Sequence, residues 1–298
     1  MLGNSDVTKS HNAVVNPLQP LFQPTPIRVQ NACNKKLVTV FSILAAEMIV
    51  APVFALKVTE PAAASHGYPA FCDMNGKKLA DGEFRQWVEN NRLHVLITYK
   101  FSAGEVYEEH SQFRQESELI QEKWSWKESK HGKSQREFAV DFLSGIGSAH
   151  ISQDQKDVSK RIKIEPGRTF AGFGFSLALS NLRKRLLRGE QVQLKAVGFS
   201  EFPTLGPQVV TVTISHGGVD RMKMSGRSLK GDRFTIHPEI PFIAKFFVNV
   251  PDTRVWLTNP APAGFLRWEG PIVLPTDPMV RVDLLSGEKS GPAEPPGS

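Results

Sequence analysis

The sequence has little cysteine and none of the motifs that cysteines build. Its 298 residues include two cysteines, Cys33 and Cys72, too few for a disulfide framework. Cys33 precedes the apolar run described below, so removal of that run would leave Cys72 as a single thiol. A lone thiol usually packs as a small apolar side chain, and we interpret Cys72 in that way.

The sequence also lacks the short motifs of common enzymes. No Gly-x-Ser-x-Gly elbow occurs. The Gly-x-Gly within Phe170–Phe175 has no phosphate-binding lysine and its gaps hold phenylalanines. We interpret this segment as close backbone packing with rings that line a core or cavity. Glu108 and Glu109 are neighbours on a predicted strand and face opposite sides, so they cannot form a catalytic pair, and we interpret them as solvent-facing.

Metal-ligand spacing is missing as well. His216, Asp220 and His237 stand apart, without a His-x-His or Cys-x-x-Cys pattern. His216 and Asp220 flank Gly217-Gly218, a spacing typical of a hairpin turn. We therefore expect no metal site, no cofactor and no recognisable catalytic residue.

One apolar run is long enough to be a signal peptide or a membrane anchor, so it indicates where the protein is located. Residues 37–55 follow Asn34-Lys35-Lys36 and end in Val53-Phe54-Ala55, which predicts a signal peptide cleaved after Ala55 and a periplasmic or secreted protein. An uncleaved membrane anchor is the alternative, and Glu47 inside the run opposes insertion. Residues 1–36 are polar and proline-rich, which indicates a disordered extension or a misassigned start codon.

Net charge and composition indicate which classes of partner and which kind of fold to expect. The net charge of +6 is modest and the bases are spread along the chain, which does not fit a nucleic-acid footprint. Apolar residues make up 40% of the sequence, as in globular proteins. We expect a linker and entry segment over residues 56–79, a single β-rich domain over residues 80–285 and a disordered tail over residues 286–298.

Two periodicities define the fold of that domain. Apolar residues alternate along residues 92–101 and return after Ser102-Ala103-Gly104, which predicts a hairpin at the start of an up-and-down meander. From Phe175 to Leu186 the apolar spacing changes to three and four, which predicts an amphipathic helix that stops at Gly189. The expected fold is mainly β, a curved antiparallel sheet or half-barrel wrapped around one central helix.

This layout carries a resemblance. The helix SLALSNLRKRLLRGE covers residues 176–190, and the segment DTRVWLTNPAPAGFLRWEG covers residues 252–270. With the preceding meander, they resemble a group of uncharacterised bacterial exported proteins related in topology to the lipoprotein carriers LolA and LolB. The resemblance covers most of residues 80–285. It implies a concave apolar surface able to hold acyl chains, and no catalytic residues. No lipoprotein cysteine follows the signal, unlike the membrane-anchored acceptor.

The sequence favours an exported, non-catalytic binding protein for a hydrophobic or lipid-like ligand. The helix would form the floor of its cavity and Ile240–Val248 the lid. The expected cavity residues are Phe173, Phe175, Leu179, Leu182, Phe242, Phe246, Phe247 and Trp256.

The basic end of the helix has two interpretations. Arg183, Lys184, Arg185 and Arg188 either form a solvated face or contact anionic lipid head groups, which would bring the protein to a membrane without insertion. Two further function classes stay open. One is a structural or protein-interaction component of the cell envelope, and the other is an envelope enzyme acting on glycan or lipid.

Overall fold

The computed structural model describes residues 55–153, 155–200, 206–224, 226–239, 250–259 and 264–284. These residues form one large sheet and one helix. Within the described ranges, the helix is too short and too polar to cross a membrane. The predicted signal peptide, except its last residue Ala55, lies outside the described residues. The predicted lid Ile240–Val248 and the predicted tail 286–298 also lie outside them.

The chain alternates between long strands and tight turns, with the helix in the middle. The strands before the helix are β1 (Ser65–Gly67), β2 (Ala70–Asp73), β3 (Lys78–Glu89), β4 (Arg92–Phe101), β5 (Glu105–Gln115), β6 (Leu119–Lys130), β7 (Lys133–Asp141), β8 (Ile146–Ile151), β9 (Lys156–Arg161) and β10 (Thr169–Phe170). The elements that follow are α1 (Gly174–Leu187), β11 (Val192–Ser200), β12 (Gly206–Met224), β13 (Arg227–Pro238), β14 (Thr253–Asn259), β15 (Phe265–Pro271) and β16 (Met279–Asp283).

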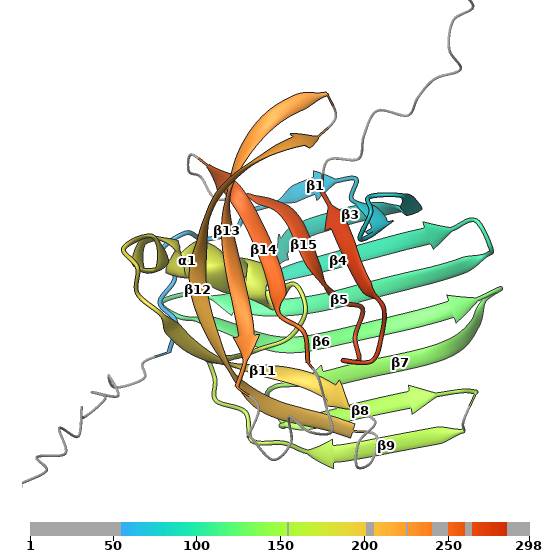
Figure 1. The fold of residues 1–298 in the computed structure, drawn as a ribbon. Coiled ribbons are helices and arrows are strands. Elements are labelled where there is room, and N and C mark those ends of the chain that lie inside the picture. The colour runs from blue at the N-terminus through green and yellow to red at the C-terminus, as the bar shows by residue number, and fades with distance from the viewer. Residues whose placement is uncertain are drawn as a thin grey trace, which may run out of the picture. The chain divides into compact units, whose positions relative to one another are not determined.

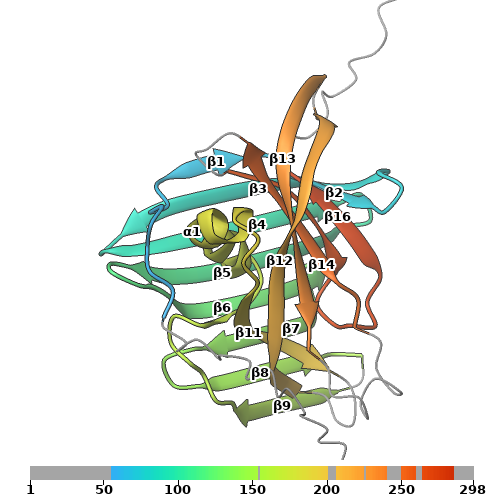
Figure 2. The same ribbon diagram turned by 60° about the vertical axis from the view of Figure 1, so that its left-hand side comes forward.

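The sheet is curved and open. Its order is β10-β11-β12-β13-β14-β15-β16-β2-β3-β4-β5-β6-β7-β8-β9, with β1 paired to β3. Every pairing is antiparallel except that of β10 with β11. Because β16 pairs with β2, the second half of the chain continues the sheet begun by the first (Figures 1 and 2). The expected fold class, a half-barrel with a single helix, is confirmed.

Side-chain alternation explains how the first half forms. Leu93, Val95, Ile97 and Tyr99 are buried along β4 while their neighbours are more exposed. This period of two places one apolar row on the concave face of the sheet. The predicted hairpin is confirmed, since β4 pairs with β5 across the turn after Phe101.

The helix buries one stripe and ends where the sequence predicts. Leu179, Leu182 and Leu186 are almost fully buried. Gly189 takes a φ of +85° just after the helix, the left-handed conformation that terminates helices and that glycine adopts without steric cost. Figures 1 and 2 show α1 between the meander and the strands β12–β14, so one sheet covers it on two sides.

The structure corrects the predicted turn at Gly217-Gly218. These glycines lie inside β12, which runs unbroken past them with a register shift between His216 and Gly218. A bulge of this kind bends a strand and increases its twist without ending it. The hairpin connection lies further on, between Met224 and Arg227, where β12 meets β13.

Residues 56–64 pack against the domain, in contrast to the predicted linker. Leu56 is buried; its N–H donates to Gly167 O at 2.8 Å and its carbonyl accepts from Leu119 N at 2.8 Å. The backbone N–H of Thr59 donates to Asn181 Oδ1 on α1 at 2.6 Å. The entry segment therefore ties the meander to the helix.

Candidate functional site

An apolar pocket lies between the two halves of the curved sheet and the start of α1. Its first wall comes from strands β2–β6 and consists of Phe71, Phe84, Ile97, Tyr99, Glu109, Trp124 and Trp126. Its second wall comes from β15, β16 and the adjoining segments and consists of Phe265, Trp268, Ile272, Val280, Val282 and Leu284. The third side is the turn into α1, with Gly172, Phe173, Phe175 and Ser176.

The pocket has a buried floor and a half-buried rim. The rings and aliphatic chains from β2–β6 are buried. The half-buried lining residues are Phe173, Phe175, Phe265, Trp268, Ile272 and Leu284. Its volume of about 90 Å³ is small beside the ~300–1,000 Å³ of sites for drug-sized ligands. It is also smaller than the apolar cavity of ~150 Å³ that holds benzene. It therefore suits a narrow chain, and a larger molecule would extend past its half-buried rim.

Phe173 bridges the two walls at the rim. Its ring centroid lies 5.2 Å from that of Phe84 on β3 and 5.8 Å from that of Phe265 on β15. Both separations fall in the range of favourable aromatic pairs. One side chain at the start of the helix therefore contacts both halves of the sheet.

Glu109 is the one carboxylate among the described residues that line this pocket. Its side chain is buried, and its Oε1 accepts hydrogen bonds from the Trp124 indole Nε1–H at 2.9 Å and from Phe173 N–H at 2.7 Å. Burial in apolar surroundings raises the pKa of Glu109, and these two hydrogen bonds oppose the rise only in part. A protonated carboxyl can donate as well as accept a hydrogen bond.

Gly172 makes the contact between Glu109 and the helix start possible. It has a φ of +50°. A Cβ on Gly172 would overlap with Glu109 Oε1 and with Trp124 Nε1. A side chain there would occupy the space where the carboxyl and the indole meet, so this position needs glycine for space as well as for backbone conformation.

Gln121 on β6 holds the same segment from its other end. Its Oε1 accepts from Ala171 N–H at 2.8 Å, and its Nε2 donates to Ala171 O at 3.2 Å. Two polar side chains from the meander, Glu109 and Gln121, therefore fix the turn that carries Phe173. This satisfies backbone groups that would otherwise be buried without partners.

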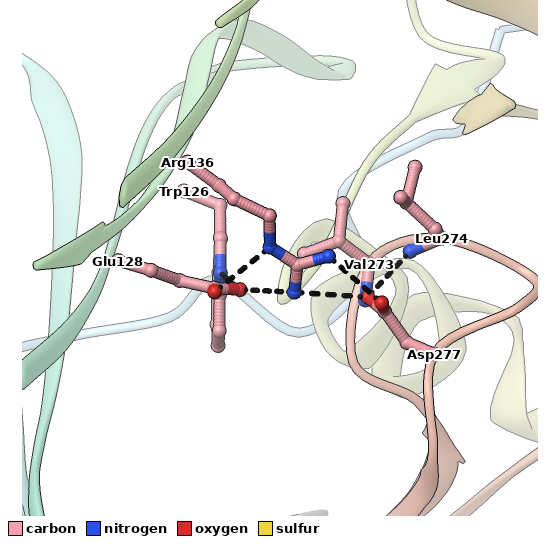
Figure 3. Close-up of polar contacts among 6 residues, drawn as sticks. All are labelled: Trp126, Glu128, Arg136, Val273, Leu274 and Asp277. Atoms are coloured by element: carbon pink, nitrogen blue, oxygen red, sulfur yellow. Dashed lines mark hydrogen bonds and ion pairs between the residues drawn. The ribbon is translucent and has the colours of Figure 1, made fainter. Parts of the chain in front are cut away.

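A buried ion-pair network fastens the second wall to the first. Arg136 on β7 donates through Nε and Nη2 to Glu128 at 2.8 and 2.6 Å, and through Nη1 and Nη2 to Asp277 at 2.8 and 3.2 Å (Figure 3). The Trp126 indole donates to Glu128 Oε1 at 2.9 Å. Burial disfavours the charged form of Arg136, but the hydrogen bonds to both carboxylates outweigh it and raise its pKa.

Asp277 carries this network into the connection between β15 and β16. Its Oδ2 accepts from Val273 N–H at 3.0 Å and Leu274 N–H at 2.9 Å (Figure 3). Leu274 is buried and its neighbour Ile272 lines the pocket. The β15–β16 connection is thus held over the sheet by one guanidinium.

The expected cavity residues divide into three groups. Phe173 and Phe175 line the pocket, whereas Leu179 and Leu182 are buried in the main core and do not line it. Trp256 lies elsewhere, in a separate apolar cluster with Met222, Met224 and Leu266, and its indole donates to Asp220 at 2.8 Å. Phe242, Phe246 and Phe247 lie outside the described residues.

The structure corrects the expectation for Arg183, which is turned inward. Its Nε and Nη2 donate to Oδ2 of the fully buried Asp232 at 2.8 and 2.6 Å, so this guanidinium is not available to an anionic surface. Lys184 is exposed. Arg185 and Arg188 are exposed and both pair with Glu190 at 2.7 Å.

The residues weighed as metal ligands do not converge. Asp220 accepts from Arg233 at 3.1 Å, and His237 pairs with Asp252 at 2.7 Å. Among the residues that the structure describes, no group of three or more histidine, cysteine or acidic side chains could hold a metal ion.

Sequence reasoning missed Glu109, which we interpreted as solvent-facing. A signal for its burial was present. Tyr107, Glu109, Ser111 and Phe113 share one parity on β5, and the aromatic residues at both ends of this row mark the concave face. An acidic residue between aromatic residues of the same parity therefore indicates a buried carboxyl.

Comparison with known proteins finds solved structures of low similarity, among them the following two. A β-barrel-like protein of the domain of unknown function DUF1849 from Brucella abortus has 9% sequence identity and a TM-score of 0.43, covering 76% of this chain and 98% of its own. The hypothetical lipoprotein YmcC from Escherichia coli (K12) has 8% identity and a TM-score of 0.32, covering 78% and 86%. No family model and no curated protein matches. Neither structure is described as a LolA or LolB carrier, so that resemblance stays a prediction.

Proposed function

We propose that this chain is an exported, non-catalytic binding protein whose pocket holds a hydrophobic or lipid-like ligand. The observation that carries the proposal is the pocket itself, which has apolar rings on three sides and a rim of half-buried side chains. Burial of an apolar chain gains about 0.8 kcal/mol per methylene. Even a short chain would therefore bind without any reaction at the site.

The pocket also bears on the two alternatives. A purely structural protein would close its apolar face with its own side chains, and the half-buried rim does not favour that arrangement. A glycan-acting enzyme needs two carboxylates that face each other across a cleft. The described residues that line the pocket supply one, Glu109.

Phe265→Asp tests the proposal at the rim. The full chain is titrated with N-phenylnaphthylamine, whose fluorescence rises in apolar surroundings. We expect Phe265→Asp to weaken binding at least tenfold, because it places a charge beside Phe173 and the pocket.

The matched control is Leu143→Asp, which replaces a side chain that is 65% exposed outside the pocket. It should bind the reporter as the wild-type chain does. Equal affinities for wild-type and Phe265→Asp chains of unchanged circular dichroism would overturn the proposed site.

A further inference from the structure

Two polar groups in the pocket have no partner among the described residues. Glu109 Oε1 is occupied by Trp124 and Phe173, but Oε2 makes no hydrogen bond with any described side chain or backbone group. The hydroxyl of Tyr99, which also lines the pocket, makes none either. Neither atom is among the fully shielded side-chain atoms that lack a partner, and both residues line the pocket, so both atoms are accessible. A ligand in this apolar pocket would displace water from them and would have to supply a polar atom in its place.

The hydrogen bonds of Glu109 determine where its proton lies. Oε1 accepts from two N–H donors, so the proton of the neutral acid belongs on Oε2, the oxygen left open. None of the ion pairs among the described residues includes Glu109, and burial raises its pKa. In the neutral acid this open oxygen is a donor, and the Tyr99 hydroxyl is a second one.

Nearby charges leave this arrangement intact. Tyr99 on β4 is the other titratable residue of the lining, and burial, reinforced by the neighbouring carboxyl of Glu109, raises its pKa, so it stays neutral. Two carboxylates on the adjacent strand β6 are buried, and each has a cationic partner. Glu128 pairs with Arg136, which also pairs with Asp277, and Glu122 pairs with Arg92 and Arg114. From β6 and the turn into α1, the atoms that contact the Glu109 carboxyl are uncharged N–H groups.

We propose that the ligand is a linear apolar molecule that ends in a neutral carbonyl, as in an ester, ketone or amide, and that its oxygen accepts a hydrogen bond from Oε2–H of Glu109. This inference rests on the proposed function and names its ligand class. A free carboxylate would bring a second acid to a site that disfavours charge. An ammonium group would fit only an ionised Glu109.

The test compares four eight-carbon probes on the full chain: methyl hexyl ketone, octane, octanoate and octylammonium. Each competes with N-phenylnaphthylamine at a series of pH values. At a pH where Glu109 is neutral, we expect the ketone to displace the reporter at least as well as octane does. A pocket without a donor would favour octane by about tenfold or more, because the buried carbonyl would lose its hydrogen bonds to water.

The Glu109→Gln variant keeps a hydrogen-bond donor at this position but cannot become charged. Its amide oxygen can accept from Trp124 and Phe173, which places its NH₂ donor toward the ligand. As pH rises and Glu109 ionises, ketone affinity in the wild-type chain should fall about fivefold, the value of a net hydrogen bond. In Glu109→Gln it should stay constant.

The outcomes distinguish the two proposals. Stronger displacement by octane than by the ketone at every pH, or preferred binding of octylammonium, overturns the carbonyl ligand and leaves the apolar pocket in place. Failure of the reporter and of all four probes to bind overturns the proposed function itself. An equal pH dependence in wild-type and Glu109→Gln chains shows that Glu109 is not the donor and also overturns the inference.

Discussion

Among the described residues that line the pocket, Glu109 supplies the one carboxyl group. It lies among aromatic rings, its Oε1 is held by two N–H groups, and its pKa is raised chiefly by burial. The same features make it a source of pH-dependent stability. A folded-state pKa above the ordinary value of 4.5 means that the unfolded chain releases this proton at a lower pH than the folded chain does.

The wild-type chain should therefore lose stability as pH rises and Glu109 ionises. The Glu109→Gln chain should not show this loss, because glutamine does not ionise. The contribution of Glu109 is fully present below pH 4.5 and is lost as pH rises through its folded-state pKa. Urea unfolding measured across pH should show that the free energy of unfolding of Glu109→Gln rises relative to that of the wild-type chain over this pH range. Above the range, the difference should stay constant.

Glu137→Gln is the control of opposite sign. The neighbouring Ser134 hydroxyl and the Lys127 ammonium lower the pKa of Glu137, so its contribution is present above 4.5 and is lost as pH falls through its folded-state pKa. A stability difference between Glu109→Gln and wild type that does not change with pH would contradict the buried, protonated carboxyl.

Single residues also show what periodicity can reveal before a structure exists. Arg183 lies four residues after Leu179 and three before Leu186, so it shares the buried stripe of α1. Its position on the helix indicated burial, although its charge suggested solvent. Its partner Asp232 lies on β13, and no local pattern links residues so far apart in sequence.

At the scale of elements, the β15–β16 connection depends on Arg136. This side chain joins Glu128 and Asp277, whose side chains are 8% and 10% exposed. Loss of the shared cation would leave two largely buried carboxylates facing each other, a change that typically costs about 3–5 kcal/mol when a buried pair is broken. The network therefore stabilises the second wall of the pocket.

Arg136→Met should lower the free energy of unfolding by about 3 kcal/mol and weaken reporter binding. The control is Lys127→Met on the adjacent strand, which breaks the exposed pair of Lys127 with Glu137 at 3.0 Å and should cost ~0–1 kcal/mol. Urea unfolding measures both variants. An Arg136→Met chain as stable as Lys127→Met would show that the network does not hold the loop.

Strands and the helix were predictable because they depend on local patterns. The alternation of β4 and the three-and-four spacing of α1 identify each element directly. The bulge in β12 was not predictable, since Gly217-Gly218 has the composition of a turn. Residues 56–64 were also missed, because their order comes from contacts with Gly167, Leu119 and Asn181 far along the chain.

At the scale of the whole sheet, pairing of distant strands creates the pocket. β16 pairs with β2, which brings Val280 and Val282 opposite β2–β6. The open edge at β9 carries Lys156, Lys160 and Arg161 on a largely exposed strand, a pattern that discourages further strands from adding to the sheet. Curvature was predictable from the need to cover the helix. The strand order that builds the two walls was not, because it depends on long-range pairing.

The central claim is that this pocket holds an apolar molecule. Its most direct test is native purification of the full chain from a bacterial periplasmic expression, followed by solvent extraction and mass spectrometry. We predict an apolar compound in near-stoichiometric amount in the wild-type extract and much less in the Phe265→Asp extract. A stable, correctly folded wild-type protein that yields no such compound, and that also fails to bind N-phenylnaphthylamine, would contradict the account.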